Sequence, residues 1–129
     1  MESNFKKIAK FTDLIAWQEG HKLVLMIYKV TKEFPKEERY CLIDQMRRAV
    51  ISITSNIAEG FSRKSSKEKS QFYKMTQGSL LELQNQLIIS RDIKYLNKED
   101  FSKIADQTVI VHKLINGLLK ATRVSKFQS

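Results

Sequence analysis

The chain has one proline and four glycines among its 129 residues, and this shortage of turn residues constrains the fold more than any other feature. A β-sandwich or β-barrel needs turn residues every few positions, so these folds are disfavoured. Hydrophobic residues make up 42% of the sequence, which is too many for a disordered chain and enough for one folded domain. The composition therefore predicts an all-α protein.

Apolar residues recur at steps of three and four, the spacing of one helix face, in four segments of the chain. These segments are 13–33, 37–61, 66–95 and 98–123. Short connections between long helices favour antiparallel neighbours. The spacing predicts an antiparallel up-down-up-down four-helix bundle over residues 12–123, with a basic N-terminal arm over 1–11 and a C-terminal tail over 124–129.

The second segment carries a polar stripe beside its apolar one. Its members share one helix face because they lie three or four residues apart; they are Gln45, Arg48, Ser52, Asn56 and Glu59. The third segment adds three polar residues to an otherwise apolar seam, namely Ser79, Glu82 and Gln86. If the second and third segments form a helical hairpin, Arg48 and Glu82 lie at a similar height along the bundle axis. Because a buried guanidinium needs a carboxylate partner, we predict an Arg48–Glu82 ion pair.

This polar stripe has two interpretations. In the first, it is a structural network that fixes helix register or subunit contacts. In the second, it is a ligand or catalytic pocket in which Arg48, Glu59 and Glu82 do acid–base work, but no nucleophile or metal motif accompanies them. We adopt the structural interpretation.

Motifs for catalysis, metal binding and nucleotide binding are missing from the sequence. His21 and His112 have no His or Cys partner at metal-ligand spacing, and no glycine-rich phosphate loop occurs. His21 lies on an apolar stripe and is predicted to be a core residue, while Cys41 is predicted to be a buried or half-buried small side chain. We therefore expect no enzyme activity, no cofactor and no metal.

The cysteine content and the apolar runs bear on the location of the protein. A single cysteine excludes an internal disulfide and fits a reducing compartment. The longest apolar run, 23–28, is far shorter than the ~20 residues of a membrane span. No signal peptide is recognisable. We expect a cytoplasmic protein with no membrane partner.

The formal net charge of +9 is concentrated in three parts of the chain: the arm, the connection between the second and third segments, and the C-terminal part. In an up-down bundle these three parts share one end, which we call the basic pole. Its predicted members are Lys6, Lys7, Lys10, Arg63, Lys64, Lys67, Lys69, Arg123 and Lys126. One interpretation is a site for the phosphates of RNA or DNA that does not read base sequence. The other is an end that only increases solubility.

Several short motifs resemble those of a known family. They are D-L-I-A-W-Q at 13–18, Q-M-R-R-A at 45–49, S-N-I-A-E-G at 55–60, G-S-L-L-E-L at 78–83 and K-Y-L at 94–96. The sequence resembles, from about 12 to 122, the four-helix-bundle protein family encoded by 23S ribosomal RNA intervening sequences, often labelled a ribosomal protein. The matching motif residues are Trp17, Gln45, Arg48, Ser52, Asn56, Glu59, Gly60, Ser79 and Glu82.

The resemblance implies an antiparallel bundle that assembles into a homo-oligomeric ring, a pentamer, without enzyme activity or cofactor. It implies RNA binding, which in the family is inferred mainly from the location of the gene. A ring-shaped protein-interaction scaffold without direct nucleic-acid binding is the alternative. Gly20 departs from the family pattern and should cost up to about 1 kcal/mol unless it allows close packing.

Overall fold

The computed structural model describes residues 7–128, the last five of them by backbone alone. Four long helices account for most of this range: α1 (Ile15–Thr31), α2 (Leu42–Ser62), α3 (Ser66–Asp92) and α4 (Lys98–Gln128). Two short 3-10 helices, η1 (Phe11–Asp13) and η2 (Lys36–Glu38), precede α1 and α2. The described residues contain no strand, which confirms the all-α prediction.

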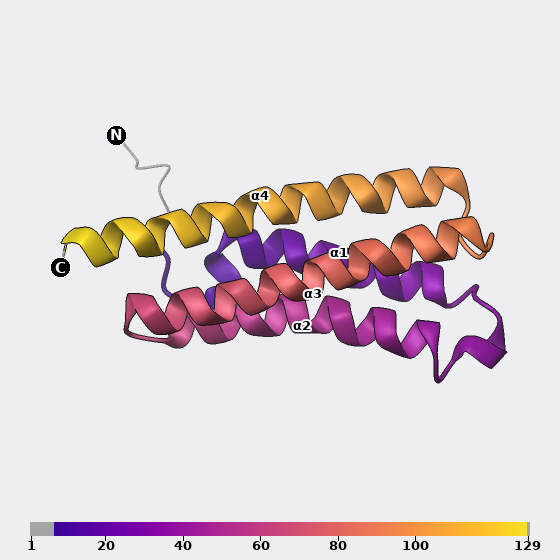
Figure 1. Cartoon of the computed structure of the whole chain (residues 1–129), viewed down its shortest axis with the longest axis horizontal. Coiled ribbons are helices and arrows are strands. Elements are labelled where there is room, and N and C mark those ends of the chain that lie inside the picture. Colours follow the sequence, from indigo (N-terminus) through magenta and orange to yellow (C-terminus); the bar gives the residue numbers. More distant parts are fainter. Residues whose placement is uncertain (1–6, 129) are drawn as a thin grey trace.

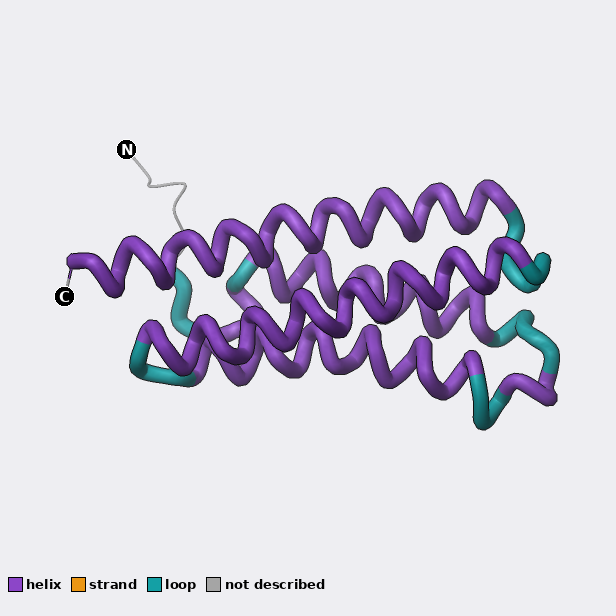
Figure 2. The backbone as a smooth tube through the Cα atoms, in the orientation of Figure 1, coloured by secondary structure: helices purple, strands orange, loops and turns teal. Residues whose placement is uncertain are grey.

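The helices lie side by side along one long axis and alternate in direction (Figure 1). Short loops join them at the two ends of the bundle (Figure 2). Each helix packs against the next in sequence, and α1 also packs against α4, where Gln107 Nε2 donates a hydrogen bond to the Glu19 carbonyl at 2.9 Å. The predicted four-helix bundle is confirmed. The start of α1, the end of α2, the start of α3 and the end of α4 share one end of the molecule.

The core lies along the bundle axis and receives side chains from all four helices. The largest fully buried side chains are Leu23, Ile27, Met46, Val50, Ile53, Ile57, Leu80, Leu83, Leu87, Ile104, Val111 and Ile115. Each such Leu or Ile contributes roughly 1.5–3 kcal/mol relative to an exposed one. Gly20 is buried, and a Cβ added there would lie 3.1 Å from Cγ2 of Thr54. The glycine therefore allows α1 to approach α2 closely, which offsets its low helix propensity.

The start of α2 and the end of α3 differ from the prediction for local reasons. α2 begins at Leu42 rather than at 37, because 36–38 form η2 and the chain turns before Cys41. Cys41 is exposed at the position preceding α2, so the prediction of a buried thiol was wrong. α3 ends at Asp92 because Lys94 adopts a positive φ of 68°, a left-handed conformation that stops a helix.

α4 is longer than predicted. It continues to Gln128, through residues that we had assigned to a C-terminal tail. The sequence has no glycine or proline after Gly117, so nothing in it stops the helix. The end of α4 projects beyond the connection between α2 and α3 (Figure 1).

Candidate nucleic-acid interface

The basic pole is organised around the short connection between α2 and α3. Ser65 caps α3: its Oγ accepts a hydrogen bond from the Glu68 backbone N–H at 3.1 Å and donates one to the Glu68 carboxylate at 3.2 Å. This N-cap fixes the direction in which α3 leaves the connection. Lys64 and Lys67 are exposed on either side of the cap. They are available to bind an anion in solution.

Lys69, which we placed in the basic pole, holds the end of α2 instead. Its Nζ donates hydrogen bonds to the carbonyls of Phe61 at 2.8 Å and Gly60 at 3.2 Å. These carbonyls lie in the last turn of α2, where intrahelical partners are missing. Burial lowers the pKa of Lys69 from its ordinary value. Its ammonium group is therefore committed to the fold.

Arg63 is exposed but its charge is largely compensated. Its guanidinium lies 3.2 Å from the Glu59 carboxylate and 4.0 Å from that of Glu68. The same group lies over the ring of Phe72, 4.8 Å from the centroid. Two carboxylates beside one guanidinium weaken its attraction for a phosphate, so Arg63 contributes less positive potential than its position in the sequence indicated.

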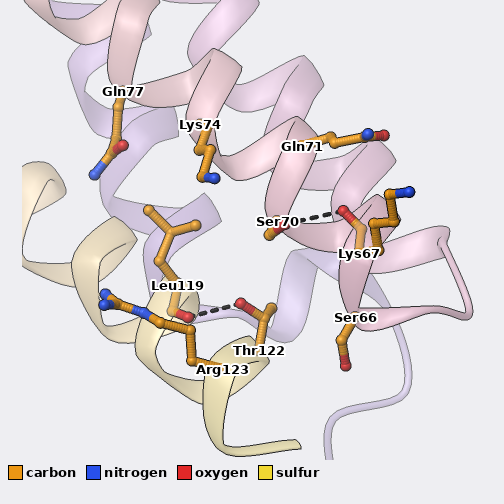
Figure 3. Close-up of a pocket in the computed structure, with 9 residues that line it drawn as sticks. All are labelled: Ser66, Lys67, Ser70, Gln71, Lys74, Gln77, Leu119, Thr122 and Arg123. Carbon is orange, nitrogen blue, oxygen red and sulfur yellow. Dashed lines mark hydrogen bonds between the residues drawn. The ribbon is translucent and has the colours of Figure 1, made fainter. Parts of the chain in front are cut away.

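Three exposed cations, Lys67, Lys74 and Arg123, line a cleft of about 640 Å³ between the start of α3 and the end of α4. Among the side chains that the structure describes, they are the only ionisable ones that line it. Figure 3 shows the side chain of Lys74 pointing from α3 toward Leu119 and Arg123 of α4. Leu119 is the one apolar residue in the described lining. The uncharged polar lining residues are Ser66, Ser70, Gln71, Gln77 and Thr122. The cleft therefore has positive charge and hydrogen-bonding groups without a lining carboxylate.

Lys74 was missing from the predicted pole. We built the pole around the connection between helices, whereas Lys74 lies two helical turns into α3. The signal was present, because Lys67 and Lys74 are seven residues apart and so share a helix face. Lys7 and Lys10 are exposed in the arm. Lys6 and the side chain of Lys126 lie outside the described residues.

The polar stripe of α2 and α3 forms a hydrogen-bonded centre with exposed ends. The hydroxyls of Ser52 and Ser79 are 2.8 Å apart across the two helices. The side chain of Asn56 donates to the Ser52 carbonyl at 2.9 Å and to its hydroxyl at 3.0 Å. Gln86 is buried, and its Oε1 has no hydrogen-bond partner among the residues that the structure describes. Of these groups, the hydroxyls of Ser52 and Ser79 connect α2 to α3.

The predicted Arg48–Glu82 ion pair was wrong. Arg48 pairs with Asp44 on its own helix, with Nε 3.0 Å from the carboxylate, and its side chain is 80% exposed. Glu82 is also exposed, and both residues line a shallow depression with Gln45. At this rim no desolvation penalty forces the guanidinium toward Glu82, and a partner one turn away is easier to reach. Gln45 and Glu59 are likewise exposed.

His21 is exposed, so its prediction as a core residue was also wrong. Its ring stacks on that of Trp17, with centroids 4.8 Å apart and planes at 12°. Within residues 7–128, no group of three or more His, Cys, Asp or Glu side chains could hold a metal ion. No helix in the same range is long and apolar enough to cross a membrane.

Comparison with known proteins agrees with the bundle and its motifs. A sequence model of the 23S rRNA-intervening sequence proteins matches residues 12–117. The chain belongs to this family. No curated protein matches it. A crystal structure of a protein of unknown function from the S23 ribosomal protein family of Bacteroides thetaiotaomicron VPI-5482 is similar, with a TM-score of 0.76 and 18% identity over 82% of this chain and 99% of that chain. At this identity the similarity shows a shared fold.

The family match includes part of the candidate interface. In this 23S rRNA-intervening sequence protein, the matched range contains the connection between α2 and α3, the polar stripe, Lys67 and Lys74. Arg123 lies beyond the matched range.

Proposed function

We propose that this protein is a non-enzymatic, oligomeric helical bundle that binds RNA or another nucleic acid through its basic pole. The observation that carries the proposal is the cleft between α3 and α4, where every ionisable lining residue among the described side chains is a lysine or an arginine. Such a surface attracts phosphates and releases their counterions. No described helix presents a set of side chains suited to reading base edges, so we propose recognition of backbone charge and not of sequence.

The spacing of the cations suits a nucleic-acid strand lying along α3. Lys67 and Lys74 are two turns apart, or about 10.5 Å at 1.5 Å per residue. A strand of a duplex advances about 3.4 Å per nucleotide, so the two lysines span about three nucleotides. Arg123 faces the same cleft from α4. The net charge of +9 would steer a polyanion toward the molecule.

A salt titration tests this proposal. The affinity for fluorescently labelled RNA of unrelated sequences would be measured by anisotropy over a series of salt concentrations. Each phosphate contact contributes about −0.7 to the slope of log K against log salt for single strands. The triple variant Lys67→Gln, Lys74→Gln, Arg123→Gln should therefore show a slope less steep by roughly two.

A matched control separates the cleft from total charge. Lys32, Lys36 and Arg39 are exposed near the other end of the bundle. Changing all three to Gln removes the same charge, and the slope should stay close to that of the wild type. Absence of binding at low salt, or equal slopes for the two triple variants, would refute the proposal.

The outer side of α3 supports the oligomeric part of the proposal. Four large apolar side chains are exposed on α3, namely Met75, Leu81, Ile88 and Ile89, and Ile93 is exposed directly after the helix ends. Leu81 is 69% exposed. A helix with apolar side chains on both its inner and outer sides usually has its outer side covered as well. We therefore propose that copies of the chain meet through α3 in a ring, for which the family resemblance indicates a pentamer.

Light scattering tests this assembly. The wild type should have a mass that is a multiple of 15.1 kDa, and Leu81→Glu should reduce it. Leu25→Glu is the matched control, since Leu25 is 58% exposed on α1. A wild-type mass of one chain, or an equal loss of mass in both variants, would contradict assembly through α3.

The same apolar surface favours a second candidate function, a ring-shaped scaffold that docks another protein without contacting nucleic acid. Capture of a protein partner that survives nuclease treatment and is lost in Leu81→Glu would support it. In either case we propose a cytoplasmic location, since Cys41 has no second cysteine to pair with in the chain.

A further inference from the structure

Three aromatic rings form a stack near the basic pole, away from the cleft. Trp17 and His21 stack nearly parallel, with centroids 4.8 Å apart. Phe11 meets Trp17 edge-on, with centroids 5.5 Å apart and planes at 67°. Phe11 and His21 are exposed, and Trp17 is half-buried. We call these three residues the aromatic stack.

The aromatic stack is held by the fold before any ligand binds. Trp17 and His21 lie one turn apart on α1, so their rings meet on one helix face. The Asp13 carboxylate accepts hydrogen bonds from the backbone N–H groups of Ala9 and Lys10, both at 3.0 Å, which fixes the chain before η1. Gln18 Nε2 also donates to the Thr12 carbonyl at 2.9 Å. A preformed surface loses little entropy when a ligand binds.

The position of His21 is not explained by the packing of the bundle. Trp17 packs against the hydrophobic core, whereas His21 is exposed and contacts Trp17 through one ring face. Lys7 and Lys10, both exposed, lie just before Phe11 in the chain. The aromatic stack thus begins next to Lys10, which directly precedes Phe11 in the chain.

We propose that the aromatic stack binds an unpaired nucleobase, so that the protein selects single-stranded over double-stranded RNA. This inference rests on the proposed nucleic-acid binding. Every base has a flat face that can stack on an aromatic ring, whatever the sequence, but bases inside a duplex are already stacked and paired. Lys7 and Lys10 would contact the phosphates next to the stacked base. The cleft supplies charge, and the aromatic stack supplies selectivity for unpaired strands.

The protein carries its own probe for this test. Trp17 is the single tryptophan, so its fluorescence reports directly on the aromatic stack. A 12-nucleotide oligouridylate and a duplex of the same length would be titrated at several salt concentrations. The single strand should quench Trp17 emission, and the duplex should not. The affinity for the single strand should exceed that for the duplex once salt weakens the phosphate contacts.

Substitution of His21 separates stacking from charge. His21→Ala should weaken single-strand binding about fivefold or more, the lower end for one base–aromatic contact, without changing the salt slope or the affinity for duplex. His21→Phe keeps a flat ring and should restore binding. Tyr40→Ala is the control, because Tyr40 is an aromatic residue 84% exposed near the other end of the bundle.

The outcomes distinguish failure of this inference from failure of the proposed function. Salt-dependent RNA binding without quenching of Trp17, and with His21→Ala equal to the wild type, would overturn the aromatic stack as a base site and leave the basic pole standing. Absence of RNA binding at low salt would overturn both. A change of mass in His21→Ala with unchanged RNA affinity would assign the surface to contacts between copies, against our inference.

Discussion

Gly60 in the last turn of α2 is the position where the structure makes the sharpest prediction about stability. A Cβ added at Gly60 would lie 2.5 Å from Cε1, 2.8 Å from Cδ1 and 3.1 Å from Cζ of Tyr73 on α3. Real Cβ atoms do not approach ring carbons this closely, so Gly60→Ala must displace the ring or the helix. Tyr73 is only 3% exposed, and its ring has little room to move.

The magnitude follows from comparing two glycines. Excess volume in a packed core costs about 1–3 kcal/mol, while alanine gains up to about 1 kcal/mol over glycine in a helix. Gly78 on α3 provides the reference, because a Cβ there meets nothing within 4 Å. Gly78→Ala should therefore raise the free energy of unfolding by about 1 kcal/mol. The free energy of unfolding of Gly60→Ala should be lower than that of the wild type. It should also lie about 1–3 kcal/mol below the value that the gain in helix propensity alone would give.

Urea unfolding followed by circular dichroism at one fixed protein concentration measures both variants. For a chain of this size each kcal/mol corresponds to roughly 3–5 °C in melting temperature, so thermal melts provide a second measurement. The coupling between Gly60→Ala and Tyr73→Leu in a double-mutant cycle should be favourable, since the smaller side chain relieves the contact. If Gly60→Ala stabilises the protein as much as Gly78→Ala, the reasoning is refuted.

Three further predictions concern the pole and the polar stripe. Burial raises the pKa of Tyr73 from its ordinary value of 10.0, so above that pH the unfolded state loses a proton that the folded state keeps. The free energy of unfolding should therefore fall as pH rises through 10 and beyond. Tyr73→Phe should reduce this fall in urea titrations from pH 8 to 11. Ser52→Ala and Ser79→Ala should show a coupling energy of about 1 kcal/mol, because their hydroxyls bond to each other; additive effects would argue against the contact. Lys69→Met should lower the free energy of unfolding by roughly 1 kcal/mol but leave the salt slope of RNA binding unchanged, since its ammonium binds the end of α2.

The helices could be predicted from the sequence because their apolar stripes are long and regular. The buried side chains of α2, for example, include Met46, Val50, Ile53 and Ile57, which recur at the helical steps of three and four. Local deviations were harder to foresee. The start of α2 shifted by five residues because a 3-10 helix competed for the same stretch, and such short elements leave little trace in hydrophobic periodicity.

The candidate site was predicted less well, because it depends on side-chain direction. Helical spacing placed Arg48 and Glu82 at a similar level but did not show that both would lie at the exposed rim. The sequence does not reveal that the Lys69 ammonium is bound by the carbonyls at the end of α2. His21 follows Trp17 by one turn on an apolar stripe, yet it lies at the edge of that stripe and faces solvent. Periodicity predicts the height of a residue along the helix axis more reliably than the direction in which its side chain points.

The alternation of helix direction also has a kinetic consequence. Among the four long helices of the described chain, α1 against α4 is the one pairing between helices that are not consecutive in sequence. Hairpins between consecutive helices close over short loops and form early, whereas joining the first helix to the last must wait for the rest. In native-state hydrogen exchange we expect the α1–α4 seam to open first and the α2–α3 hairpin last. The contact between α1 and α4 would then open locally while the surfaces formed by α3 stay folded.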